Sequence, residues 1–286
     1  MANIIRSPKH GRDWTKNDLR AFNIEVVSEN VATFFENADL PPPNISPSIL
    51  AHETYPAAGL PTDDQLFFDL LDEVMHPCPV EKSAVDDFAV HLLRLLGYAE
   101  PNRYFVTQKD IPLHMCSDYT YTKPNVCVVD QTSRSVRLLL QEDEGCLEGN
   151  DPEPQLIAGA IAAFQSHNFH LYSLGLPTAT TAIIPGITMV WTAPTFYKIS
   201  VNTTLVEAVR LGEYPVQTTT VRKLIPPVQK LWHFHQEGMQ PLDNRAVILS
   251  CFEAFKQFLS AGSGELEGQW MEKVSEGIAG SPLFFP

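Results

Sequence analysis

KPNVCVVDQTSRSVRLLLQEDE, residues 123–144, consists of two apolar runs joined by a polar stretch. This pattern is typical of a β-hairpin. A turn centred between positions 132 and 133 makes the numbers of paired residues sum to about 265, so that Asn125 lies opposite Leu140. Because side chains alternate along a strand, one face of the hairpin then carries Asn125, Leu140, Glu142 and Glu144, with Asp143 on the other. A slip of one residue in the pairing changes this grouping.

The segments on either side of the hairpin extend it into an α/β domain. Apolar residues recur at helical spacing in some segments, and shorter runs have the composition of strands. The expected helices cover residues 63–76, 81–96, 153–165, 207–211 and 244–259, and the expected strands cover residues 103–108, 111–116, 125–130, 136–142, 186–191 and 195–201. This order predicts a mixed central sheet flanked by helices.

The two ends of the chain differ from this central region. Residues 1–62 contain Pro41, Pro42 and Pro43, and further prolines follow up to Pro61. Proline lacks a backbone N–H and resists regular structure, so we expect an irregular N-terminal extension lying over the main body. The core domain is then residues 63–260, and residues 261–286 form a tail rich in glycine.

The composition is typical of a protein from the cytoplasm or nucleus. No stretch reaches the roughly 18 consecutive apolar residues that a membrane-spanning helix needs, so we expect no membrane partner. The five cysteines lack CxxC spacing, which favours reduced thiols over a disulfide framework or a zinc site. The net charge of −14 opposes nonspecific binding to nucleic acid.

Several short motifs carry a resemblance to a known family. They are Pro124-Asn125, Leu140-Gln-Glu-Asp-Glu144 and the helix-forming segment EPQLIAGAIAAFQ at residues 153–165. This series resembles the motifs of the PD-(D/E)XK nuclease superfamily. Together with PGITMV (185–190), PTFYKI (194–199) and PLDNR (241–245), it is more closely similar to a group of uncharacterised fungal proteins. The resemblance covers about residues 63–260 and implies a restriction-endonuclease-like core.

The resemblance also implies roles for individual residues. In the superfamily, an Asp after Pro and the Glu of the second motif hold divalent metal, and a Lys positions the attacking water. Glu142 occupies the retained carboxylate position, but Asn125 stands where Asp is expected and Glu144 where Lys is expected. Gln155 matches a glutamine that supports the site, and Lys123 is a candidate to replace the missing lysine.

The resemblance implies one more acidic residue, on the helix before the strands. Glu81, at the start of the expected helix, is the preferred candidate, and Asp87 is the weaker one. Spacing alone does not select between the two residues.

Plainer interpretations stand beside these roles. Glu142 and Glu144 fit a solvated strand end as well as a residual metal site. Gln155 fits an ordinary polar position at a helix start, and Asn125 can satisfy nearby backbone groups. Six acids lie within residues 142–153 and no Lys or Arg lies among them, so this surface repels a phosphodiester unless a metal fills it.

The leading hypothesis is a nuclease-like domain that has lost catalysis and acts as a binding or interaction protein. Its partner is a protein, a small molecule or a nucleic acid. The alternative is an active metal-dependent nuclease that binds Mg²⁺ or Mn²⁺ through Glu142 and Asn125. In that case Glu144, Gln155 and Lys123 complete the catalytic set.

Overall fold

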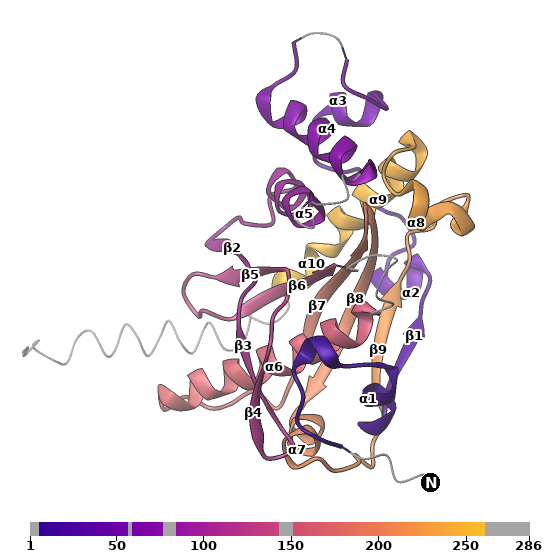
Figure 1. Ribbon diagram of the computed structural model, residues 1–286. Helices are drawn as coiled ribbons and strands as arrows, with labels where there is room; N and C mark the ends of the chain where they lie inside the picture. Colours follow the sequence, from indigo (N-terminus) through magenta and orange to yellow (C-terminus); the bar gives the residue numbers. More distant parts are fainter. Residues whose placement is uncertain (1–5, 57–58, 77–83, 143–150, 261–286) are drawn as a thin grey trace, which may run out of the picture.

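The computed structural model describes residues 6–56, 59–76, 84–142 and 151–260. Its centre is a seven-stranded mixed sheet with helices on both faces, and a two-stranded sheet packs beside it (Figure 1). The α/β architecture predicted from the sequence is therefore confirmed. The strands are β1 (Ile24–Ser28), β2 (Arg103–Thr107), β3 (Ile111–Met115), β4 (Asp118–Thr122), β5 (Val126–Asp130), β6 (Val136–Glu142), β7 (Thr181–Val190), β8 (Ala193–Asn202) and β9 (Thr219–Leu224).

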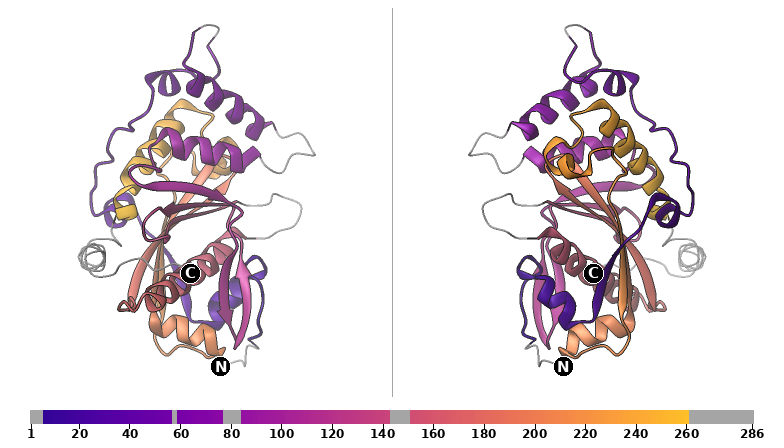
Figure 2. Two further views of the ribbon diagram at one scale, coloured as in Figure 1. Left: turned by 90° about the vertical axis from the view of Figure 1, so that its left-hand side faces the viewer. Right: turned by 90° about the vertical axis from the view of Figure 1, so that its right-hand side faces the viewer.

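The helices follow the same numbering. They are η1 (Gly11–Asp13), α1 (Lys16–Ala21), α2 (Val31–Phe35), α3 (Pro47–Ala51), α4 (Thr62–Met75), α5 (Ala84–Leu95), α6 (Pro152–Ser173), α7 (Thr203–Leu211), η2 (Leu231–His233), α8 (Phe234–Glu237), α9 (Leu242–Phe255) and α10 (Gln257–Ser260). The helices α3, α4 and α5 lie at the top of Figures 1 and 2, and α7 lies at the bottom. In the part of the chain that is described, none of these helices has the length and apolar character needed to cross a bilayer.

The central sheet has the strand order β1-β9-β8-β7-β6-β5-β2. The strands β2, β5 and β6 pair antiparallel. The chain then crosses over through α6, and β7 pairs parallel to β6. The strands β7, β8 and β9 pair antiparallel again. A long crossover helix is the usual way to join parallel neighbours, and it makes α6 the main cover of one face.

One face of the sheet packs against α4, α5 and α9, and we call it the α5 face. On β5, Val126 and Val128 point to this face, where Phe88, Leu92 and Phe252 are fully buried. Alternate residues of a strand point to opposite sides, so Cys127 and Val129 belong to the other core. An apolar run such as residues 126–129 is expected where both sides of a strand are covered.

The opposite face packs against α6, α7 and the β3–β4 hairpin, and we call it the α6 face. The helix α6 begins with Asp151 as its N-cap, whose side chain accepts a hydrogen bond from the Glu153 backbone N–H at 3.0 Å. All residues from Pro152 to Phe164 are buried, because this half of the helix is enclosed by the sheet and the hairpin. At Gly186 of β7 an added Cβ would lie 2.9 Å from the Leu156 side chain, so the helix and sheet approach closely there.

The N-terminal segment is more regular than we predicted from its prolines. Its strand β1 pairs in parallel with β9 and completes the central sheet. Phe22 is buried on the α6 face, and Phe34 and Ile49 are buried on the α5 face. The prediction of an irregular extension missed these elements because β1 gains its hydrogen bonds from a strand almost two hundred residues later, which no local pattern records.

Candidate functional site

The β5–β6 hairpin has a register that differs by one residue from the prediction. Near the turn, Val129 pairs with Val136, so the numbers sum to 265 as expected. A β-bulge follows between Val128 and Val129, and farther out Val126 pairs with Leu140, a sum of 266. The prediction that Asn125 lies opposite Leu140 is therefore wrong. The reason is the bulge, which inserts one extra residue into β6 and shifts every later pair.

Asn125 and Glu142 meet in spite of this shift, because Asn125 immediately precedes β5 and Glu142 is the last residue of β6. The Asn125 side-chain oxygen accepts a hydrogen bond from the Glu142 backbone N–H at 3.0 Å and another from Gln141 Nε2 at 2.7 Å. A backbone N–H can only donate, so the atom facing it must be the amide oxygen. This contact sets the orientation of the whole amide. It also provides a hydrogen-bond acceptor for the Glu142 backbone N–H, as the plainer interpretation of Asn125 anticipated.

The amide nitrogen of Asn125 points toward two carboxyl groups. Its Nδ2 lies 3.3 Å from Asp86 Oδ2 and 3.5 Å from Glu142 Oε2. Asp86 comes from the first turn of α5, which packs against this end of the sheet. Asn125 is itself buried, with 8% of its surface exposed. The site is therefore a pair of carboxyl groups with an amide N–H donor between them.

Asp86 is the acidic residue that the sequence did not identify. Asp87 is exposed to solvent, and Glu81 lies outside the described residues. The helical spacing of Asp86 with the buried residues Ala89 and Leu93 places it beside the apolar stripe. Helical spacing could therefore have pointed to Asp86, but it selects Asp86 as a site residue only when α5 is known to pack against this end of the hairpin.

The electrostatics of Asp86 reflect its position in the first turn of α5, beside Asn125 and Glu142. Burial raises the pKa of Asp86, and hydrogen bonds with Asn125, Gln108 and Glu142 oppose that rise. Gln108 Nε2 donates to Asp86 Oδ2 at 3.4 Å, and the Gln108 backbone N–H donates to the Asn125 carbonyl at 2.9 Å. The other oxygen, Asp86 Oδ1, is buried and has no hydrogen-bond partner within the described chain. Asp86 therefore ties α5 and the residue after β2 to the end of the hairpin.

The other predicted site residues that the structure describes make no side-chain hydrogen bond or ion pair with this cluster. Lys123 Nζ forms a long ion pair with Asp110 at 3.9 Å. Gln155 is buried in the first turn of α6 and makes no side-chain hydrogen bond to another described residue. Glu144 lies outside the described residues. Their predicted catalytic roles thus stay predictions.

The acids at the start of α6 have cationic partners that are distant in sequence. Asp151 pairs with Lys16 Nζ at 2.8 Å. Glu153 Oε2 accepts hydrogen bonds from Lys223 Nζ at 2.6 Å and from Tyr197 Oη at 3.0 Å. Burial raises the pKa of the Tyr197 hydroxyl, and the neighbouring Glu153 charge raises it further. The repulsive surface expected from the acid-rich sequence is therefore neutralised in part, and these contacts anchor α6 to α1, β8 and β9.

The described residues do not fit a resident Mg²⁺ or Mn²⁺ ion. Such hard cations require several converging oxygen ligands. Over residues 6–56, 59–76, 84–142 and 151–260, no three His, Cys, Asp or Glu side chains are grouped so that they could hold a metal. The unpartnered Asp86 Oδ1 is a possible ligand atom, but the Asn125 oxygen already accepts two hydrogen bonds and its N–H group faces the carboxylates.

Comparisons with known proteins add no family assignment. A scan against models of protein families and a search of curated proteins both found no match. The resemblance to the PD-(D/E)XK superfamily therefore stays a prediction from the sequence. The geometry around Asn125 is the main guide to function.

Proposed function

We propose that this chain is a catalytically degenerate, nuclease-like domain that acts as a binding or interaction protein. The observation that carries the proposal is the orientation of the Asn125 amide. Its Nδ2 lies 3.3 Å from Asp86 Oδ2 and 3.5 Å from Glu142 Oε2, where a catalytic site would need a cation. An N–H group hydrogen-bonds the carboxyl oxygens but cannot activate water as a metal ion does.

The surroundings of the cluster favour the same conclusion. Hydrolysis of a phosphodiester needs positive charge near the reacting phosphate and a means of activating water. Among the residues that the structure describes, Lys123 is paired with Asp110, and the hydrogen-bond partners of Asp86 are the amides of Asn125 and Gln108 and the carboxyl group of Glu142. Such a site is better suited to holding α5 against the sheet than to cleaving a phosphate ester.

A cleavage assay tests the loss of catalysis. The purified chain is incubated with single-stranded DNA, double-stranded DNA and RNA in Mg²⁺ or Mn²⁺, beside a Glu142→Gln variant prepared in the same way. We expect equal background cleavage from both proteins. Metal-dependent cleavage by the wild type that disappears in Glu142→Gln would overturn the proposal and support the active nuclease.

The Asn125→Asp variant tests the role of the amide directly. It replaces the N–H donor by a third carboxylate, so we expect it to melt at a lower temperature than the wild type without metal. Added Mn²⁺ should raise that temperature, and calorimetry should show Mn²⁺ binding at least about tenfold tighter than to the wild type. Equal Mn²⁺ affinity of the two proteins would contradict the proposed function of the amide.

A further inference from the structure

A cavity lies at the opposite end of the β5–β6 hairpin from Asn125 and Glu142. Its volume is about 190 Å³, and it is lined by the hairpin turn, the start of β3 and the C-terminal half of α6. Lys109, Arg134, His167 and His170 are among its lining residues. No single motif in the sequence groups these residues, because they come from three separate segments.

The charge around this cavity is opposite to that of the whole chain. Of its charged lining residues, Lys109 and Arg134 are cations and Asp110 is an acid. Asp110 pairs with Lys123 at 3.9 Å and Asp130 with Arg137 at 3.7 Å. The whole chain has 34 acidic residues and 20 Lys and Arg residues, so a local excess of cations is unusual here. Lys109 and Arg134 leave the cavity with a positive balance.

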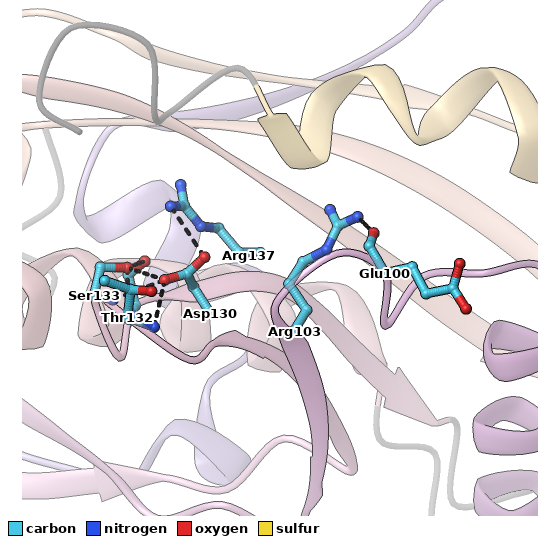
Figure 3. A network of polar contacts seen from close by, with 7 residues as sticks. Glu100, Arg103, Asp130, Thr132, Ser133 and Arg137 are labelled. Carbon is cyan, nitrogen blue, oxygen red and sulfur yellow. Dashed lines mark hydrogen bonds and ion pairs between the residues drawn. The ribbon is translucent and has the colours of Figure 1, made fainter. Parts of the chain in front are cut away.

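The turn that forms one wall is held by the Asp130 carboxylate (Figure 3). Asp130 Oδ1 accepts hydrogen bonds from the backbone N–H groups of Thr132 and Ser133 and from the Ser133 hydroxyl. Burial alone would raise the pKa of Asp130, but these hydrogen bonds and the charge of Arg137 together lower it. The Asp130 carboxylate is therefore stabilised in its ionised form by donors of the turn itself and by Arg137.

Hydrogen-bond donors remain available at the cavity wall. Lys109 makes no hydrogen bond and no ion pair with any residue that the structure describes. Arg134 Nη1 donates to the Tyr104 hydroxyl at 3.1 Å, which uses one of the five N–H groups of a guanidinium. Burial lowers the pKa of His167, which favours the neutral ring, and a neutral imidazole carries one N–H.

We propose that this cavity binds the phosphate group of a small phosphorylated ligand. At about 190 Å³ it is smaller than typical pockets for drug-sized ligands, which measure roughly 300–1,000 Å³, so it suits a single compact group. A phosphate presents several acceptor oxygens and up to two negative charges, which match the ammonium of Lys109 and the guanidinium of Arg134 among the lining residues. The inference does not depend on whether the Asn125 cluster is catalytic.

Titration calorimetry of the full chain with EDTA present tests this site. The probes are inorganic phosphate, glycerol phosphate as a phosphate monoester, and acetate as an anion of lower charge. We expect saturable binding of either phosphate probe and much weaker binding of acetate. The variants Lys109→Met and Arg134→Gln should each weaken phosphate binding by about tenfold or more, since each loses a charge-assisted hydrogen bond.

Matched controls keep the result interpretable. Arg94 is exposed on α5, so Arg94→Gln removes the same charge elsewhere and should leave phosphate affinity unchanged. Glu142→Gln should also leave it unchanged, which separates this site from the carboxyl cluster. The melting temperature of each variant checks that it is folded. Absence of saturable phosphate binding, or an equal loss in Arg94→Gln, would overturn the proposal, as would stronger binding of acetate.

Discussion

At the scale of single residues, Asn125 illustrates how one atom changes the chemistry of a site. Asparagine has nearly the size of aspartate, so the hairpin accommodates either residue, but its nitrogen is a donor. In this chain the Asn125 oxygen is bound to the Glu142 backbone N–H, and the donor therefore faces Asp86 and the Glu142 carboxyl group. The site is stabilised by hydrogen bonds among its own groups.

The same cluster predicts a dependence of stability on pH. Burial raises the pKa of Asp86 above its ordinary value of 3.8. A carboxyl group whose pKa is higher in the folded state contributes stability below the unfolded value, and this is lost as the pH rises through the folded value. Asparagine has no carboxyl group to ionise, so the Asp86→Asn variant does not lose stability in this way as the pH rises. We therefore expect it to melt at a higher temperature than the wild type near neutral pH.

Thermal unfolding measured from pH 4 to pH 8 checks the prediction for Asp86. The difference between Asp86→Asn and the wild type should grow as the pH rises from about the ordinary Asp value. Asp69 is exposed on α4, so Asp69→Asn is a control that should follow the wild-type curve. Curves that stay parallel for Asp86→Asn and the wild type would show that Asp86 does not titrate in this range.

At the scale of helices and strands, Arg245 holds α9 to the N-terminal segment. Its side chain is fully buried and lies over the rings of Phe67 and Phe68 of α4. Its guanidinium donates to backbone carbonyls of Ile49, His52, Glu53, Met239 and Gln240. Burial lowers the pKa of Arg245 to about 10, which still leaves it charged at neutral pH.

The carbonyl contacts of Arg245 predict a large effect of a conservative change. A lysine side chain has one nitrogen and cannot reach the carbonyls of both residues 49–53 and residues 239–240, so Arg245→Lys leaves buried acceptors without partners. We expect a loss of about 3 kcal/mol in the free energy of unfolding, measured by urea denaturation. The exposed Arg94→Lys should change it by less than about 0.5 kcal/mol. An effect of Arg245→Lys as small as that control would show that the carbonyls find other partners.

At the scale of the whole molecule, residues 6–56 belong to both hydrophobic cores. The strand β1 covers the edge of β9, Phe22 packs on the α6 face, and Phe34 and Ile49 pack on the α5 face. These contacts connect the start of the chain to elements that come much later in the sequence. The molecule therefore depends on its first residues for closure of the sheet and for filling of both cores.

A truncation tests this dependence. A chain of residues 63–286 lacks two fully buried phenylalanines, and each such loss costs about 3–5 kcal/mol, against a typical total stability of roughly 5–15 kcal/mol. It also exposes the edge of β9. We expect no cooperative thermal transition and a tendency to aggregate, measured by near-ultraviolet circular dichroism and gel filtration. A cooperative transition near that of the full chain would contradict this expectation.

Strong local patterns in the sequence were enough to predict several of the helices and strands. The apolar runs at 126–129 and 138–140 predicted β5 and β6, and the helical spacing after residue 62 predicted α4 and α5 to within a few residues. The predicted strands missed β1, β4 and β9, and the helix predicted at 153–165 extends to Ser173. Local pattern is sufficient where one segment contains its own turn, cap or apolar stripe.

The residues that form the site come together only through contacts between distant segments. A bulge in β6 set the register, and the packing of α5 brought Asp86 to Asn125 and Glu142. Lys223 reached Glu153 from a distant strand for the same reason. Contacts of this kind form between segments far apart in the chain, so their energies depend on the packed arrangement, and periodicity within one segment contains no information about them.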